Sequence, residues 1–125
     1  MKRKIILWGY PHGSHTHSYL YYGMKRAFEY LGQEVHWFHD GDYPSPNDFD
    51  YEDAVFLVDN QGRTDNNVPI IASGIYISYD VFTNLNKYLG NVKGLINYRV
   101  AEYKQPIPDG KRYVEVEKGI VFDTE

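Results

Sequence analysis

The chain has 125 residues, 42% of them hydrophobic and 24% charged, and its formal net charge is −4. This length fits one domain, and the apolar content is sufficient for a core, which excludes intrinsic disorder as the main state. No apolar run approaches the roughly 18 residues of a membrane span, and a mildly acidic chain lacks the basic surface of a general nucleic-acid binder. The absence of cysteine excludes disulfides and thiolate chemistry. We therefore expect a cytoplasmic domain that binds no nucleic acid and has no membrane span.

The first part of the chain predicts one strand–helix–strand unit. Lys4–Trp8 is a short apolar run, typical of a strand that is buried on both faces. After the loop Gly9–Ser18, apolar side chains recur every three or four positions over Tyr19–Leu31, which predicts a helix. Ser18 is a candidate N-cap residue, and Ser14 or Thr16 could cap an earlier start. A second strand follows at Glu34–Phe38. The two strands should be parallel and their crossover right-handed.

Three further strands and a short helix are predicted in the middle of the chain. The apolar runs that predict strands are Ala54–Val58, Gly74–Ser78 and Val92–Tyr98, the last of them weakened by an internal glycine. Val81–Leu89 predicts the short helix. Short apolar strands that alternate with helices favour a Rossmann-like α/β fold, an open and mostly parallel sheet flanked by helices.

The composition changes after residue 100, where prolines and an Asp-Gly pair indicate turns. Tyr113–Glu117 alternates between apolar and polar residues, as an antiparallel strand with one exposed face does. Ile120–Phe122 is placed to pair with it across a Lys-Gly turn. We therefore expect one domain, with a Rossmann-like core over residues 1–100 and a C-terminal extension or β-hairpin over residues 101–125.

The loops that follow the strands are the candidate sites, because ligands of open α/β sheets bind beyond the carboxyl ends of the strands. These loops are Gly9–Ser18, His39–Asp53, Asp59–Asn67 and Tyr79–Val81. The first contains small residues and histidines before a helix, and backbone N–H groups at a helix start attract a phosphate or a carboxylate. The candidate substrate-binding residues are Gly9, Pro11, His12, Gly13, Ser14, Thr16 and Ser18 in the first loop and Asn60, Gln61 and Gly62 in the third.

The histidines of the first loop leave several chemistries open. His12, His15 and His17 carry a side chain that suits zinc. His15-x-His17 is similar to the H-x-H of metal-dependent amidohydrolases, but those enzymes need a complete eight-stranded barrel. The run His12-Gly13-Ser14-His15 is similar to the H-x-G-H motif of small cytidylyltransferases, with the glycine displaced. Neither the G-x-G-x-x-G motif nor the Walker A motif is present.

Two acidic pairs, Asp40-x-Asp42 and Asp48-x-Asp50, match the D-x-D motif that holds a metal and the sugar nucleotide in single-domain glycosyltransferases. Carboxylate oxygens suit magnesium or manganese. An acidic surface loop produces the same pattern by chance, and this loop comes earlier in the chain than the motif does in that family. We therefore expect a solvated loop here and no metal site.

The segment from Lys4 to Asp40 resembles the N-terminal half of two-domain (GT-B) glycosyltransferases. Its helix and second strand have the pattern G-x-x-x-A-F-x-x-L-G-x-E-V-x-W-F, which is similar to the opening of that family. Asp48–Tyr51, Val55–Val58 and Asn67–Ile70 resemble glycosyltransferases of large DNA viruses and bacteria in particular. The resemblance extends from residue 3 to about residue 100, and the order of the elements carries it.

The resemblance implies a transferase half that holds a hydroxyl acceptor. Its general base would come from the loop after the first strand or from a later strand end, positions that match His15, His17 and Asp59. A histidine there has an intrinsic pKa suited to taking a proton near neutral pH. The resemblance implies no cofactor, and a nucleotide sugar that is bound by a second domain absent from this chain.

Two other functions stay open beside the transferase half. The first is a non-catalytic α/β module that binds a nucleotide or a carbohydrate, and the second is a small nucleotidyltransferase. A missing partner domain or an exposed sheet edge would favour a homo-oligomer.

Overall fold

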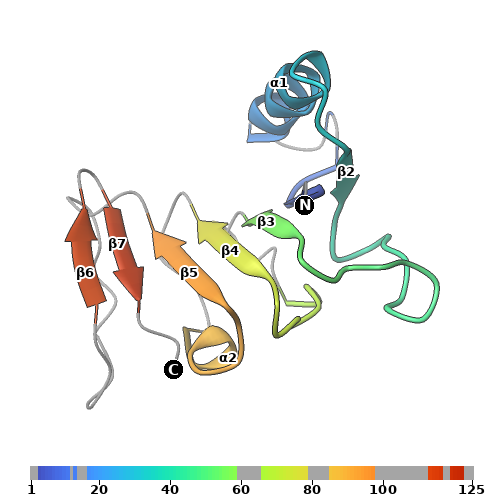
Figure 1. The fold of residues 1–125 in the computed structure, drawn as a ribbon. Coiled ribbons are helices and arrows are strands. Elements are labelled where there is room, and N and C mark those ends of the chain that lie inside the picture. Colours follow the sequence, from blue (N-terminus) through green and yellow to red (C-terminus); the bar gives the residue numbers. More distant parts are fainter. Residues whose placement is uncertain are drawn as a thin grey trace.

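The computed structural model describes residues 3–11, 13, 17–58, 66–78, 85–97, 113–116 and 119–122. In this part of the chain, seven strands form one sheet in the order β2-β1-β3-β4-β5-β7-β6 (Figure 1). The strands are β1 (Ile5–Trp8), β2 (Val35–Phe38), β3 (Val55–Val58), β4 (Ile75–Ser78), β5 (Gly94–Asn97), β6 (Tyr113–Val116) and β7 (Gly119–Phe122). The helices are α1 (His17–Tyr30) and α2 (Leu85–Tyr88).

The strand pairing confirms the predicted fold class. Strands β1 to β5 pair in parallel, whereas β7 pairs antiparallel with both β5 and β6. The sheet is therefore open and mostly parallel, with a C-terminal hairpin added at one edge. β2 lies on one side of β1 and β3 on the other, and this 2-1-3-4-5 order of parallel strands is one of the common doubly wound orders.

The starts of α1 and β5 each differ from the predicted ones by two residues. α1 begins at His17 rather than Tyr19, so Ser18 lies inside the helix, where its Oγ accepts a hydrogen bond from the N–H of Gly13 (3.0 Å). β5 begins at Gly94 rather than Val92. The reason is that the N–H groups of Lys93 and Gly94 both donate to the carbonyl of Gly74 (3.0 and 3.3 Å), where the ladder with β4 starts.

One face of the sheet is closed by aromatic side chains and loops. Phe56 and Tyr76 stack with their ring centroids 4.4 Å apart, and Tyr51 and Tyr88 extend this row on either side. All four rings are buried. The hydroxyl of Tyr76 donates to the carbonyl of Pro69, and burial raises the pKa of Tyr76 well above its usual range. This aromatic face therefore satisfies its buried hydroxyl while it excludes water.

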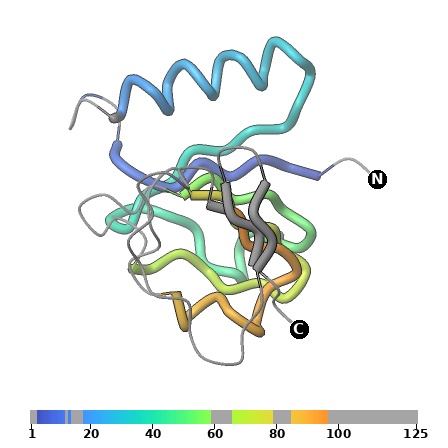
Figure 2. The backbone as a smooth tube through the Cα atoms, turned by 90° about the vertical axis from the view of Figure 1, so that its left-hand side faces the viewer, coloured from blue at the N-terminus to red at the C-terminus, as the bar shows by residue number. Residues whose placement is uncertain are grey.

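The opposite face is built mainly from aliphatic strand residues, with Trp37 in its edge strand, and α1 covers it over β1 and β2. Tyr21 of the helix packs against Ile5 and Leu7, together with Met24 and Phe28. Gly9 makes this approach possible, because a Cβ at that position would lie 2.5 Å from the ring of Tyr21. In Figure 2, α1 lies on one side of the strands and α2 on the other. Neither described helix has the length and hydropathy that crossing a bilayer requires.

Candidate functional site

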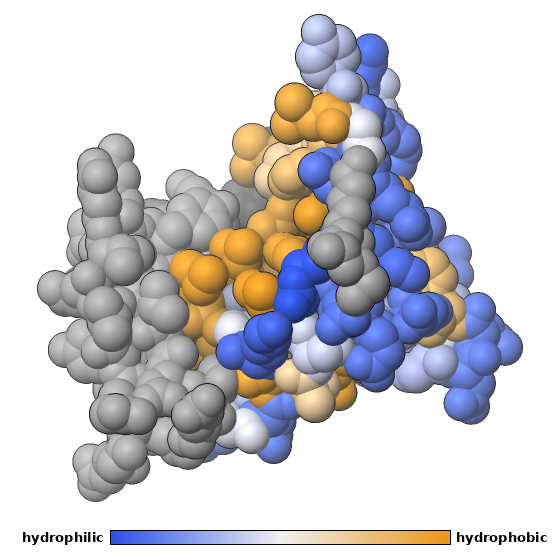
Figure 3. Space-filling view, in the orientation of Figure 1, coloured by the Kyte–Doolittle hydropathy of each residue, from blue (hydrophilic) through white to orange (hydrophobic). Residues whose placement is uncertain are grey.

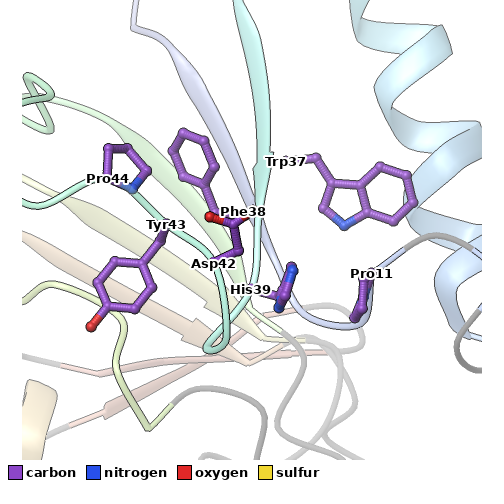
Figure 4. Close-up of a pocket in the computed structure, with 7 residues that line it drawn as sticks. All are labelled: Pro11, Trp37, Phe38, His39, Asp42, Tyr43 and Pro44. Carbon is purple, nitrogen blue, oxygen red and sulfur yellow. The ribbon is translucent and has the colours of Figure 1, made fainter.

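A pocket of about 370 Å³ lies where β1 and β2 end, at the carboxyl edge of the sheet. This volume is typical of small-molecule sites, which measure roughly 300–1,000 Å³. It is lined by Pro11, Trp37, Phe38, His39, Asp42, Tyr43 and Pro44. In Figure 4, Trp37 and Pro11 lie on the side of α1, Tyr43 lies on the opposite side, and the ring of His39 stands between them. The pocket therefore combines aromatic and proline rings with one imidazole and one carboxylate.

The two aromatic sides of the pocket are held by contacts beneath them. The indole N–H of Trp37 donates to the carbonyl of Tyr10 (3.1 Å), which ties the end of β2 to the loop after β1. The ring of Tyr43 rests on the buried Trp8, with the ring centroids 5.1 Å apart. The hydroxyl of Tyr51 donates to the carbonyl of Pro44 (2.5 Å). These contacts position the rings before any ligand arrives.

The polar groups of the pocket come from a tight turn after β2. The backbones of His39 and Asp42 bond to each other in both directions (3.4 and 3.1 Å). The N–H of Gly41 donates to Nδ1 of His39 (3.1 Å). In the neutral ring the proton is therefore on Nε2, which can donate a hydrogen bond. The Asp42 carboxylate accepts no hydrogen bond within the described part of the chain, so a donor and an acceptor are both available.

Asp40, in the same turn, is used to hold the structure together. Its Oδ1 accepts the indole N–H of Trp8 (2.8 Å) and the backbone N–H of Asn67 (3.0 Å). Its Oδ2 accepts the backbone N–H of Asn66 (2.9 Å). The first carboxylate of Asp40-x-Asp42 thus joins β1 to the segment before β4, and the second lines the pocket. Over the described residues no group of three or more metal-ligating side chains is present.

The structure brings one of the predicted substrate-binding residues, Pro11, to this pocket. Gly9 is buried under Tyr21, Gly13 has a positive φ of 83°, and Ser18 is fully buried. His17 is the first residue of α1. The other candidates lie outside the described residues, and their roles stay predictions: His12, Ser14, His15, Thr16, Asp59, Asn60, Gln61 and Gly62.

Sequence reasoning missed most of the pocket, although it named the loop His39–Asp53 as a place to look. Trp37 and Phe38 were expected only as strand residues. Because β2 is an edge strand, all of its side chains are half-buried rather than enclosed, and Trp37 and Phe38 at its carboxyl end line the pocket. The run of aromatic residues that ends in His39, at the end of a strand, is the signal that indicates the site.

Comparisons with models of protein families, with curated proteins and with solved structures give no significant match. The structure shows a Rossmann-like α/β fold with a pocket at the carboxyl ends of β1 and β2.

Proposed function

We propose that this domain binds a sugar in the pocket and acts as the acceptor-side half of a glycosyltransferase. The observation that carries the proposal is the combination of rings and polar groups in one pocket. A sugar ring has apolar C–H faces, which pack against aromatic side chains, and hydroxyls that both donate and accept hydrogen bonds. The Nε2–H of His39 can donate a hydrogen bond to a sugar hydroxyl, and the carboxylate of Asp42 can accept one. The two groups can bind two different hydroxyls or the same one.

The same carboxylate can take part in transfer. Asp42 would accept the proton of an acceptor hydroxyl as the oxygen attacks the anomeric carbon of a nucleotide sugar. The bond between that carbon and the diphosphate oxygen breaks, and the nucleoside diphosphate leaves. A second domain would hold the nucleotide sugar. Asp42 thereby joins His15, His17 and Asp59 as a candidate base, while His39, which has its Nδ1 engaged by Gly41, orients the acceptor.

A non-catalytic carbohydrate-binding module is the second candidate. One observation favours it: the imidazole of the pocket is held as a hydrogen-bond donor. The described pocket therefore offers only one group, Asp42, that could act as a base. Both functions need the same sugar complex, and they differ in whether a nucleotide sugar is consumed.

Calorimetric titration with a panel of monosaccharides, nucleotide sugars and free nucleotides tests the binding step. We expect a sugar to bind and Asp42→Asn to weaken it by about 10-fold or more, since a hydrogen bond to a charged group contributes about 1.5–3 kcal/mol. Asp50→Asn is the matched control, because Asp50 lies outside the pocket and an asparagine keeps an oxygen for the N–H of Glu52. Binding of free nucleotides alone, or sugar binding that Asp42→Asn leaves unchanged, would contradict the proposal.

A further inference from the structure

The aliphatic face of the sheet is only partly covered in the described structure. α1 packs over β1 and β2, but Ile75 and Ile77 of β4 and Ile96 of β5 are half-exposed and belong to neither described core cluster. Parallel sheets are almost always covered on both faces. The space-filling view in Figure 3 shows an apolar band that runs from α1 onto the neighbouring strands. In the described part of the chain, no helix covers β3, β4 and β5 on this face.

α1 itself carries a second apolar side that its own sheet does not cover. Leu20 is 58% exposed, Leu31, just after the helix, is 67% exposed, and Tyr30 is 91% exposed. Together with the exposed Ala27 they follow helical spacing along one side. The other flank is polar, with Lys25 paired to Glu29 (3.0 Å). A helix that is apolar on two sides is typical of a buried helix.

Gly23 lies on this second side, in the middle of α1. A glycine at a helix interior costs about 1 kcal/mol relative to alanine. A Cβ added at Gly23 would meet nothing within 4 Å, so packing inside this chain does not require the glycine. A surface without side-chain bulk at this point lets another backbone approach closely.

We propose that two copies of this chain form a dimer in which α1 of each copy lies over β3, β4 and β5 of the other. The described residues supply both halves of this contact, a helix with an exposed apolar side and a sheet face over which they place no helix. The sizes match, because three strands span about 10 Å, which is the diameter of one helix with its side chains. A two-fold axis repeats the helix–sheet contact, so the two copies form a closed dimer.

The exposed area is consistent with a dimer interface. Tyr19 is 62% exposed and Tyr30 is 91% exposed. At about 200 Å² of surface per aromatic side chain, these two residues together leave about 300 Å² of apolar surface in contact with solvent. A standard interface takes about 800 Å² from each partner. The leucines of the helix and the isoleucines of the sheet face add to the tyrosine surface. None of these residues lines the pocket, so the dimer does not depend on the proposed function.

Sedimentation equilibrium of the full chain, from micromolar to millimolar concentration, tests the dimer. We expect a monomer–dimer equilibrium whose dissociation constant rises at least about 100-fold in the double variant Leu20→Glu/Leu31→Glu, because two interface anchors are lost. The matched control is Lys25→Glu, on the polar flank of the same helix, which lowers the net charge by two as the double variant does. The control should dimerise like the wild type.

A second variant tests the sheet half of the contact. Ile77→Thr keeps a β-branched residue in β4 and should also weaken the dimer. A mixture of Ile77→Thr with the leucine variant should associate more tightly than either alone, since one of the two helix–sheet contacts is intact in the mixed dimer. A wild-type chain that stays monomeric would overturn the proposal. So would a dimer that Ile77→Thr does not weaken, or one that Lys25→Glu disrupts as strongly as the leucine variant.

Discussion

The two faces of the sheet are built from different side chains and are covered by different parts of the chain. The aromatic face is closed by loops, and its phenol hydroxyls bond to loop carbonyls at Pro44 and Pro69. Among the described residues, α1 covers the aliphatic face over β1 and β2, and partly exposed isoleucines lie beside it. Directional aromatic contacts can position a loop, so the aromatic face supports one side of the pocket, while Trp37, which packs beside Tyr21 of α1, forms the other side. Aliphatic contacts are not directional, so the other face is suited to association.

The largest expected effect compares two neighbouring residues of β3 that point to opposite faces. Phe56→Ala should destabilise the fold by about 3–5 kcal/mol, because Phe56 is fully buried between Tyr51 and Tyr76. Leu57→Ala, on the aliphatic face, should cost less than about 2 kcal/mol, since Leu57 is only half-buried. Denaturant unfolding of both variants measures the difference. Equal losses of stability in the two variants would contradict the proposed difference between the aromatic and the aliphatic face.

The next effect separates the structural carboxylate from the ligand-binding one. Asp40→Ala leaves the indole N–H of Trp8 and two backbone N–H groups without their acceptor, and should cost about 1–3 kcal/mol. Asp42→Ala should change stability by less than about 0.5 kcal/mol while it removes sugar binding. Thermal unfolding and calorimetry on the two variants check this pair. A stability loss at Asp42 as large as that at Asp40 would contradict the assignment of roles.

Alkaline pH should weaken the aromatic face selectively. Burial raises the pKa of Tyr51 from its ordinary 10.0 to about 12. Because folding raises this pKa, the stabilisation is complete below pH 10 and is lost as the pH rises toward 12. Tyr51→Phe should reduce this alkaline loss, and near neutral pH it should cost about 1 kcal/mol for the hydrogen bond to Pro44. The free energy of unfolding of the wild type and of Tyr51→Phe, measured across this pH range, tests this prediction. An equal loss of stability at alkaline pH in both proteins would refute it.

The smallest effect concerns the outer edge, next to β2. A hydrogen bond with His36 (2.7 Å) lowers the pKa of Glu34 below its ordinary 4.5. Because folding lowers this pKa, the stabilisation is present above pH 4.5 and is lost as the pH falls below that value. Glu34→Gln should therefore lower the melting temperature slightly at neutral pH and not at all in strong acid. A variant that is equally destabilised at both pH values would show that the charge is irrelevant.

The sequence predicted the strands and helices well because apolar runs and helical spacing are local signals. Lys4–Trp8 and Ala54–Val58 predicted β1 and β3 to within a residue at each end. The neighbours of each strand are set by long-range pairing, so nothing local showed that β2 would be an edge strand. The pocket depends on that edge position. Asp40 and Asp42 were indistinguishable as sequence, because only the fold brings donors to one of them.

The most direct test of the account is an NMR spectrum of the indole N–H groups during a sugar titration. The chain has two tryptophans; Trp37 lines the pocket, and Trp8 is fully buried beneath it. We predict that the Trp37 resonance moves with the sugar concentration and saturates, and that the Trp8 resonance moves less. Saturable sugar binding that leaves the Trp37 resonance in place, or the absence of any sugar binding, would contradict the central claim that this pocket is a sugar site.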